Sequence, residues 1–216
     1  MLLWSTKVEE ARRGYGEDRI SSVRGDGCTI FVIADGAGGA SGGADAADAV
    51  CIALKDNATG ESDWSAWLMR CDRAMATSAS SGLTAAIVIS ISDDGVVSGA
   101  SVGDCEAWVF GQGAPVELTV SQIRKPLLGD GMAVAIGFAG RLSSGTLVVA
   151  SDGLWKYMTQ GSVAEKASVR PIDQAVTALV DGVRLPSGAL HDDVAVMLCE
   201  LALVKSPGEP LCQASR

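Results

Sequence analysis

The sequence has a single histidine, His191, and its six cysteines are scattered without any Cys-x-x-Cys pair. A structural zinc site of the usual kind therefore lacks its ligands. The opening residues MLLW lack the basic start of a secretory signal peptide. We therefore expect a cytoplasmic protein whose cysteines are reduced thiols, with a disulfide framework as the less favoured alternative.

Aromatic residues make up only 5% of the chain, and no apolar run is long enough to span a bilayer. Basic residues are also few: 17 lysines and arginines face 26 acidic residues, which gives a net charge of -9. We therefore expect neither a membrane nor a nucleic acid as a partner. Proline-rich linkers and internal repeats are absent, which predicts one domain over residues 1–204 and a flexible C-terminal tail over residues 205–216.

Hydrophobic residues make up 48% of the sequence, enough for a substantial core. Apolar spacing predicts helices over 44–54, 63–78 and 172–182, and strands over 29–34, 84–91, 96–102, 107–110, 146–150 and 194–204. Residues 129–140 are expected to form a compact loop. The turn sequence Ser92–Gly95 predicts a hairpin, which favours antiparallel pairing. These features predict an α+β fold, a four-layer α-β-β-α sandwich of two antiparallel sheets flanked by helices.

Acidic residues recur where strands begin or end. Asp35-Gly36 and Asp152-Gly153 each follow an apolar strand, and Asp192-Asp193 and Glu17-Asp18 each precede one. Any one of these acids alone is more typical of a turn or a helix cap. Several converging carboxylates, however, repel one another unless cations neutralise them. Divalent ions that prefer oxygen ligands, magnesium or manganese, are the expected partners.

The glycine-rich segment after Asp35 is a poor match to nucleotide-binding loops. It lacks the Lys-Ser/Thr of a P-loop, and Ser41 stands where a dinucleotide fingerprint has its third glycine. We therefore do not expect a nucleotide cofactor.

Six segments carry a resemblance to a known family. They are GYGED, FVIADGAGG, SGLTAAIV, GASVGDCEAWVF, VVASDGLWKYM and HDDVAVML, in this order over residues 10–203. The sequence resembles the metal-dependent protein phosphatases, the PPM or type 2C serine/threonine phosphatases, and is similar to their compact bacterial members. The resemblance implies an enzyme that hydrolyses phosphoserine and phosphothreonine through a hydroxide bridging two divalent cations, manganese or magnesium.

The resemblance also implies roles for particular residues. Asp35 matches the aspartate that bridges both metals, and the Gly36 carbonyl, Asp152 and Asp192 match further ligands. Glu17 and Asp18 match the acidic pair that binds or orients metal-bound waters. Arg13 matches the arginine that grips the substrate phosphate, and His191 lies beside a ligand position. His191 could protonate the leaving group, although a packing or hydrogen-bonding role is favoured.

The sequence departs from the family pattern at several positions. At the position of Lys156, many family members have an aspartate. In those members it holds a third metal jointly with the aspartate that Asp104 matches. We expect the third metal to bind poorly, with the Lys156 ammonium near Asp104 or in solvent. Glu106 replaces a basic residue, and the short connection from Phe110 to Thr146 predicts a reduced flap beside an open site.

Three functions remain open at this stage. The favoured one is a protein phosphatase that acts on a phosphorylated protein and opposes a serine/threonine kinase. A catalytically weak or inactive pseudophosphatase that serves as a regulatory binding module is the second. A phosphatase of a small phosphorylated molecule is the third.

Overall fold

The structure of the protein is a computed structural model, which describes residues 1–37, 42–57, 60–78 and 82–202. The expected tail over 205–216, Cys212 and Ser41 lie outside these residues. The strands are β1 (Leu2–Glu9), β2 (Arg19–Arg24), β3 (Cys28–Gly36), β4 (Thr84–Ser92), β5 (Val96–Val102), β6 (Glu106–Phe110), β7 (Val116–Glu117), β8 (Ile136–Arg141), β9 (Thr146–Ala150) and β10 (Val194–Leu201). The helices are α1 (Gly43–Asn57), α2 (Trp64–Ala76), α3 (Asp152–Trp155), α4 (Gln160–Ala167) and α5 (Ile172–Gly182).

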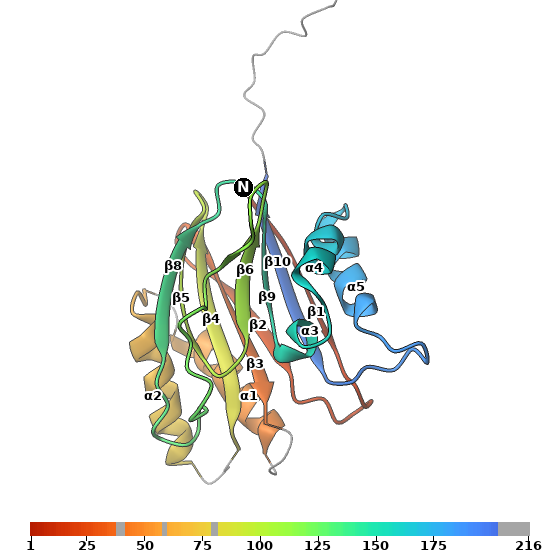
Figure 1. Ribbon diagram of the computed structural model, residues 1–216. Coiled ribbons are helices and arrows are strands. Elements are labelled where there is room, and N and C mark those ends of the chain that lie inside the picture. The colour runs from red at the N-terminus through yellow and green to blue at the C-terminus, as the bar shows by residue number, and fades with distance from the viewer. Residues whose placement is uncertain (38–41, 58–59, 79–81, 203–216) are drawn as a thin grey trace, which may run out of the picture.

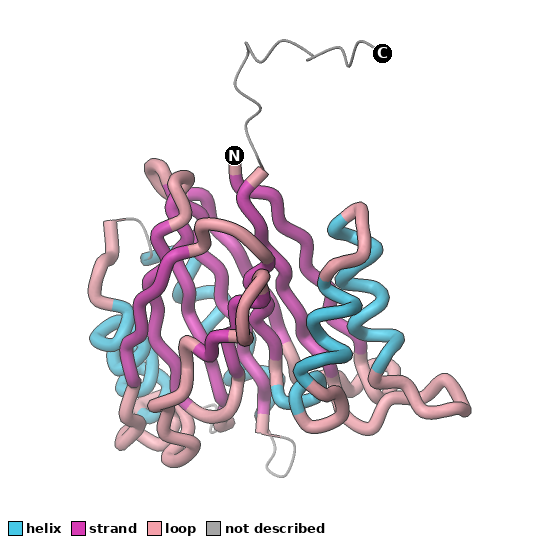
Figure 2. The backbone as a smooth tube through the Cα atoms, turned by 45° about the horizontal axis from the view of Figure 1, so that its top comes forward, coloured by secondary structure: helices cyan, strands magenta, loops and turns pink. Residues whose placement is uncertain are grey.

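Two five-stranded antiparallel sheets pack face to face (Figures 1 and 2). One has the strand order β1-β10-β9-β6-β7 and the other the order β2-β3-β4-β5-β8. Helices α3, α4 and α5 lie on the outer face of the first sheet, and α1 and α2 lie on the outer face of the second (Figure 1). This is the four-layer α-β-β-α sandwich expected from the sequence, and that prediction is confirmed.

Three apolar layers hold the sandwich together. Between the sheets, alternate residues of each strand pack against one another, among them Phe31, Ile87 and Val149. The residues between them along each strand face the helices, because successive side chains of a strand point to opposite faces. β3 and β4 are therefore apolar on both faces, which explains why their sequences are nearly continuous hydrophobic runs.

Most of the elements expected from apolar spacing are present. The turn at Ser92–Gly95 joins β4 to β5, and Asp63 caps α2 by accepting a hydrogen bond from the Ala66 backbone N–H at 2.9 Å. The loop expected over 129–140 is wrong in its second half, because β8 forms there and pairs with β5. The sequence of β8, IGFAGR, has two glycines and no β-branched run, so its strand signal is weak. β1, α3 and α4 were not expected at all.

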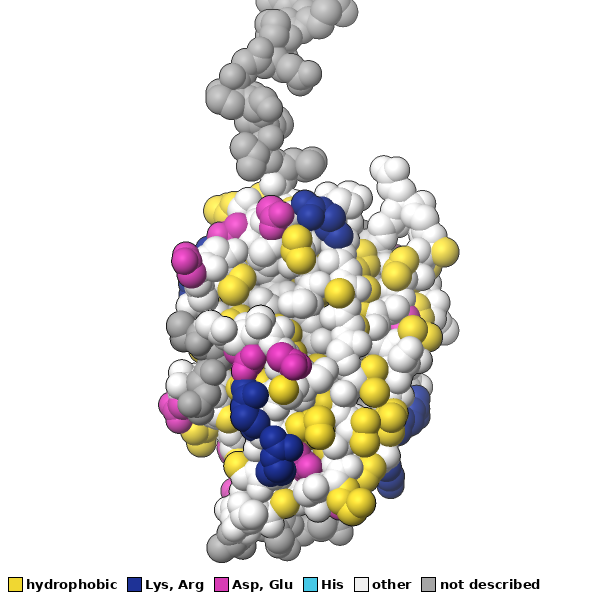
Figure 3. Space-filling model, turned by 90° about the vertical axis from the view of Figure 1, so that its left-hand side faces the viewer, with side chains coloured by type: hydrophobic (Ala, Val, Ile, Leu, Met, Phe, Trp, Pro, Cys, Tyr) yellow, Lys and Arg dark blue, Asp and Glu magenta, His cyan; other side chains and the backbone are white. Residues whose placement is uncertain are grey.

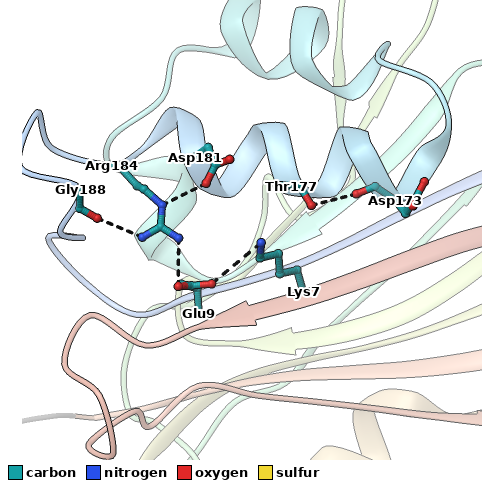
Figure 4. A network of polar contacts seen from close by, with 7 residues as sticks. All are labelled: Lys7, Glu9, Asp173, Thr177, Asp181, Arg184 and Gly188. Atoms are coloured by element: carbon teal, nitrogen blue, oxygen red, sulfur yellow. Dashed lines mark hydrogen bonds and ion pairs between the residues drawn. The ribbon is translucent and has the colours of Figure 1, made fainter.

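A polar network fixes the end of β1 against α5 (Figure 4). The Arg184 guanidinium contacts Glu9 at 2.9 Å and Asp181 at 3.0 Å, and it donates a hydrogen bond to the Gly188 carbonyl at 3.1 Å. Lys7 lies 4.0 Å from the other oxygen of Glu9. Because Glu9 is the last residue of β1, this network fixes the point from which the following loop, residues 10–17, departs.

β8 is an edge strand of the second sheet, on the side shown in Figure 3, where hydrophobic side chains lie among a few charged ones. Its outward-facing residues Gly137, Ala139 and Arg141 are exposed. Arg141 lies 3.5 Å from Asp94 in the β4–β5 turn. A short edge strand that ends in a charged residue is poorly suited to pairing with another chain.

The cysteines of the described residues, Cys28, Cys51, Cys71, Cys105 and Cys199, are free thiols, as expected. Within the described part of the chain, every helix is too short or too polar to cross a bilayer.

Candidate metal centre

Three aspartates from different elements meet at one end of the sandwich. Asp35 lies near the end of β3, Asp104 follows β5 by two residues, and Asp152 is the first residue of α3, directly after β9. One carboxylate oxygen from each lies within 4.8 Å of the other two. Strands from both sheets thus deliver acidic groups to one point, which is what the recurrence of acids at strand ends predicts.

The three aspartates line a cavity of about 380 Å³. Its wall also contains Glu17, Asp18, Gly36, Ala37, Ala85, Leu127, Lys156, Asp192 and Asp193. The complete lining, with Asp35, Asp104 and Asp152 included, has seven acidic residues and one basic residue. The cavity is therefore strongly negative.

Burial and mutual repulsion disfavour the charged form of these carboxyls. Burial, followed by the charges of Asp18 and Asp152, raises the pKa of Asp35 to about 9. Burial also raises the pKa of Asp18 to about 7, against a hydrogen bond from Ser151 that lowers it. The pKa values of Asp104 and Asp192 are raised as well, again chiefly by burial. Several carboxyls that are too crowded to ionise together are characteristic of a site that holds cations.

Hydrogen bonds position two of the acids. Ser151, which is fully buried, donates to Asp18 at 2.6 Å and accepts from the Ala195 backbone N–H at 2.9 Å. Asp18 precedes β2 and Ser151 follows β9, so this bond connects the two sheets at the floor of the site. The Thr84 hydroxyl donates to the Asp35 carbonyl at 2.8 Å and fixes the end of β3.

Gly36 allows three segments to approach closely. A Cβ at this position would overlap the backbone of Gly43 at the start of α1 and lie 2.8 Å from the Glu17 Cβ. Glycine is therefore required here for packing, because any side chain would collide with these segments.

Asp193 holds the loop of residues 10–17 against the cavity. Its two carboxylate oxygens accept hydrogen bonds from the backbone N–H groups of Ala11 at 2.7 Å and Glu17 at 2.6 Å. From the sequence, Asp193 was expected only as one of the converging acids and had no role of its own, and Ser151 was not singled out. Their only signal is adjacency to Asp192 and Asp152, which does not distinguish them from ordinary turn residues.

Arg13 and His191 lie apart from the cavity wall. Arg13 is exposed on the 10–17 loop and is not among the residues that line the cavity. The His191 ring stacks on Tyr157, with centroids 4.5 Å apart and planes 11° from parallel. This stacking gives the His191 ring a packing contact, and proton transfer by His191 stays a prediction.

Lys156 has two acidic partners besides Asp104, the residue near which it was expected to lie. Its ammonium contacts the Asp152 carboxylate directly and lies 3.8 Å from an oxygen of Asp192. Asp104 also interacts electrostatically with Lys156, but its carboxylate forms no direct ion pair with the ammonium in the described residues, whereas that of Asp152 does. The reason is geometric: Lys156 lies one helical turn after Asp152, and residues four apart share one face of a helix.

The donor set fits divalent cations. Asp35, Asp152 and Asp192 offer carboxylate oxygens, and Gly36 offers a carbonyl, all from residues that line the cavity. Hard oxygen ligands without imidazole or thiolate favour magnesium or manganese. A cation would also relieve the repulsion that raises the pKa of Asp35.

No protein-family model matches the sequence, and no curated protein matches it. Solved structures do match. A bacterial serine phosphatase is 17% identical over 94% of this chain and 98% of its own, with a TM-score of 0.77. The serine/threonine phosphatase Stp1 from Staphylococcus aureus is 18% identical over 94% and 96%, with a TM-score of 0.75.

The catalytic domain of the serine/threonine protein phosphatase PstP, solved in complex with two manganese ions, is 18% identical over 92% of this chain and 97% of its own. Its TM-score is 0.71. The chain therefore has the fold of the bacterial serine/threonine phosphatases of the metal-dependent PPM type, as its motifs led us to expect.

Proposed function

We propose that this protein is a metal-dependent serine/threonine protein phosphatase. The observation that carries the proposal is the convergence of Asp35, Asp104 and Asp152 within 4.8 Å in an acidic cavity. The fold shared with phosphatases, one of them solved with two manganese ions, supports it.

In this proposal, Asp35, the Gly36 carbonyl, Asp152 and Asp192 hold two divalent cations, manganese or magnesium. Glu17 and Asp18 orient water around them. The bound cations would supply Lewis acidity, which lowers the pKa of water and neutralises charge on the phosphoryl oxygens. Ser151 holds Asp18 in position, and Thr84 holds the Asp35 backbone.

We propose that Arg13 binds the phosphoryl group from the 10–17 loop, because a guanidinium forms paired hydrogen bonds to phosphate oxygens. The loop is anchored to the cavity by Asp193, so Arg13 starts from a fixed base. We propose that His191, which precedes Asp192 and stacks on Tyr157, has a packing role beside this ligand.

The proposed substrates are phosphoserine and phosphothreonine in proteins phosphorylated by a cognate kinase, and the proposed location is the cytoplasm. We assign the activity to one domain over residues 1–204. The wall of the cavity has few apolar residues, Ala37, Ala85 and Leu127 among them, which suits a phosphate more than a large apolar ligand.

Hydrolysis of para-nitrophenyl phosphate tests the proposal. We expect turnover with manganese or magnesium, none with a chelator, and loss of turnover in Asp35→Asn. A panel of phosphopeptides and small phosphorylated metabolites then separates a protein phosphatase from a small-molecule phosphatase. Metal-independent turnover, or turnover that survives in Asp35→Asn, would contradict the assignment.

The contact between Lys156 and Asp152 favours a second candidate, a catalytically weak phosphatase that serves as a binding module. Folded protein that binds manganese but hydrolyses none of these substrates would support this candidate.

A further inference from the structure

Lys156 is the one basic side chain among the described residues that line the acidic cavity. Its ammonium contacts Asp152 and lies 3.8 Å from Asp192. Both carboxylates belong to the set proposed above to hold divalent cations. A monovalent cation built into the chain thus occupies oxygens that a divalent cation would use.

Hydrogen bonds hold the backbone around Lys156, whereas its side chain is half-exposed. The Lys156 backbone N–H donates to the Asp152 carbonyl at 2.9 Å, and the neighbouring Trp155 indole donates to the Ala150 carbonyl at 3.1 Å. The side chain is 50% exposed. A lysine carries its charge on a flexible four-carbon stem, so the ammonium can leave Asp152 and still remain at the cavity wall.

The charge of the cavity makes the Lys156 ammonium important for binding an anionic substrate. A phosphate dianion that enters the cavity faces seven acidic residues and this one lysine. Arg13, the other cation proposed to bind phosphate, is exposed and does not line the cavity. Among the described residues that line the cavity, Lys156 is therefore the one that offers a positive charge to an anion inside it.

We propose that Lys156 has two successive partners: it competes with divalent cations for Asp152 and Asp192, and once displaced it binds the substrate phosphate. The inference rests on the proposed function, because it requires divalent cations in the cavity. It makes Lys156 both a brake on metal binding and a substrate-binding residue.

The two roles predict opposite effects of one substitution. In Lys156→Met the carboxylates are always free, so manganese should bind more tightly, on the order of tenfold if the wild-type site is free one time in ten. Inorganic phosphate should then bind the manganese-loaded variant more weakly, by roughly three- to tenfold, because a charge-assisted contact is lost. Lys156→Arg keeps the charge and should restore phosphate binding.

Calorimetry with manganese alone, and then with inorganic phosphate on manganese-loaded protein, measures both effects without reference to turnover. Lys55→Met is the matched control, since it removes the same charge from an exposed position twelve residues, or about 18 Å of helix, beyond the start of α1. Its manganese and phosphate affinities should equal those of the wild type.

Wild-type protein that binds manganese as tightly as Lys156→Met would overturn the inference alone. So would phosphate affinity that is unchanged in Lys156→Met. Wild-type protein and Lys156→Met that both fail to bind manganese would overturn the proposed metal site and this inference together.

Discussion

The carboxylate of Asp193 accepts a hydrogen bond from the Glu17 backbone N–H at 2.6 Å, across 176 residues of sequence. Its second oxygen accepts from the Ala11 N–H at 2.7 Å. One side chain thus closes both ends of the loop that carries Arg13. If Arg13 binds the phosphoryl group, Asp193 fixes the position of the loop from which its guanidinium extends.

We predict that Asp193→Ala lowers the free energy of unfolding by about 2–4 kcal/mol, because two partly buried backbone N–H groups lose their acceptor. The KM for a phosphopeptide should rise more than kcat falls, since the loop and not the metal ligands is displaced. Asp193→Asn keeps one acceptor and should be intermediate. Urea denaturation and steady-state kinetics measure these effects.

Asp26→Ala is the matched control for this prediction, because Asp26 is exposed in the turn between β2 and β3. Its unfolding free energy should stay within about 0.5 kcal/mol of the wild type. Equal stability of the Asp193 and Asp26 variants would show that the loop does not depend on the carboxylate.

Metal-free protein should become more stable as the pH falls. Burial raises the pKa of Asp35 from 3.8 to about 9 and that of Asp18 from 3.8 to about 7. Between the ordinary pKa and the raised pKa of each group, the folded state therefore binds more protons than the unfolded state. Stability therefore decreases as the pH rises from about 4 to about 9. Thermal melting in chelator across this range measures the slope.

Two additions sharpen the pH prediction. Saturating manganese should raise the melting temperature most at neutral and alkaline pH, because the cation neutralises the carboxylates that repel one another. Metal-free Asp35→Asn should be more stable than metal-free wild type at pH 8, by about 2 kcal/mol. A melting temperature that rises with pH in chelator would contradict the assigned repulsion.

Asp72 on α2 predicts a large effect far from the acidic cavity. It is 2% exposed, and its carboxylate accepts hydrogen bonds from the backbone N–H groups of Gly129, Gly131 and Ala133 at 2.8, 2.9 and 3.1 Å. Asp72→Ala should cost about 3 kcal/mol, since one buried and two partly buried hydrogen bonds lose their acceptor. Asp130→Ala, in the same loop but exposed, should cost less than about 0.5 kcal/mol.

Urea denaturation of the two variants distinguishes the roles. If both lose the same stability, the hydrogen bonds to Asp72 do not stabilise the loop. Manganese affinity should remain measurable in Asp72→Ala at low temperature, because its contacts lie outside the cavity wall.

The sequence could predict the layers of this fold because its central strands are buried on both faces. Short apolar runs rich in β-branched residues, such as that of β3, favour a buried strand over a helix. β1 was missed because its residues are mostly half-buried, and its pairing with β10 joins opposite ends of the chain. β8 was missed because glycines 137 and 140 remove the apolar alternation that marks a strand.

The sequence could predict which acidic residues form the site, but not the hydrogen bonds that hold them in place. Aspartates at strand ends can be read from local sequence, and Asp35 and Asp152 do meet with Asp104. The hydrogen bond that Ser151 donates to Asp18 spans 133 residues, and the one that the Glu17 backbone donates to Asp193 spans 176. No local pattern encodes such pairs. Lys156 shows the converse, since its partner lies four residues away and helical spacing alone would have identified it.

An alanine at Gly153 tests how tightly the site is packed. A Cβ at Gly153, directly after Asp152, would overlap the Asp193 carbonyl oxygen and lie 3.2 Å from a Val194 methyl. Gly153→Ala should therefore force α3 and the start of β10 apart and cost about 3 kcal/mol or more. Because Asp152 and Asp192 flank this contact, manganese affinity should fall in the same variant.

Gly161→Ala is the counterpart, because Gly161 lies within α4 with nothing within 4 Å of the added Cβ. This substitution should stabilise the protein by about 0.5–1 kcal/mol and leave manganese affinity unchanged, since alanine restricts the unfolded chain and favours a helix. Thermal melting and manganese titration of the pair separate local overlap from a general intolerance of alanine. If Gly153→Ala kept both wild-type stability and manganese affinity, α3 could not be packed against β10 as closely as the structure has it.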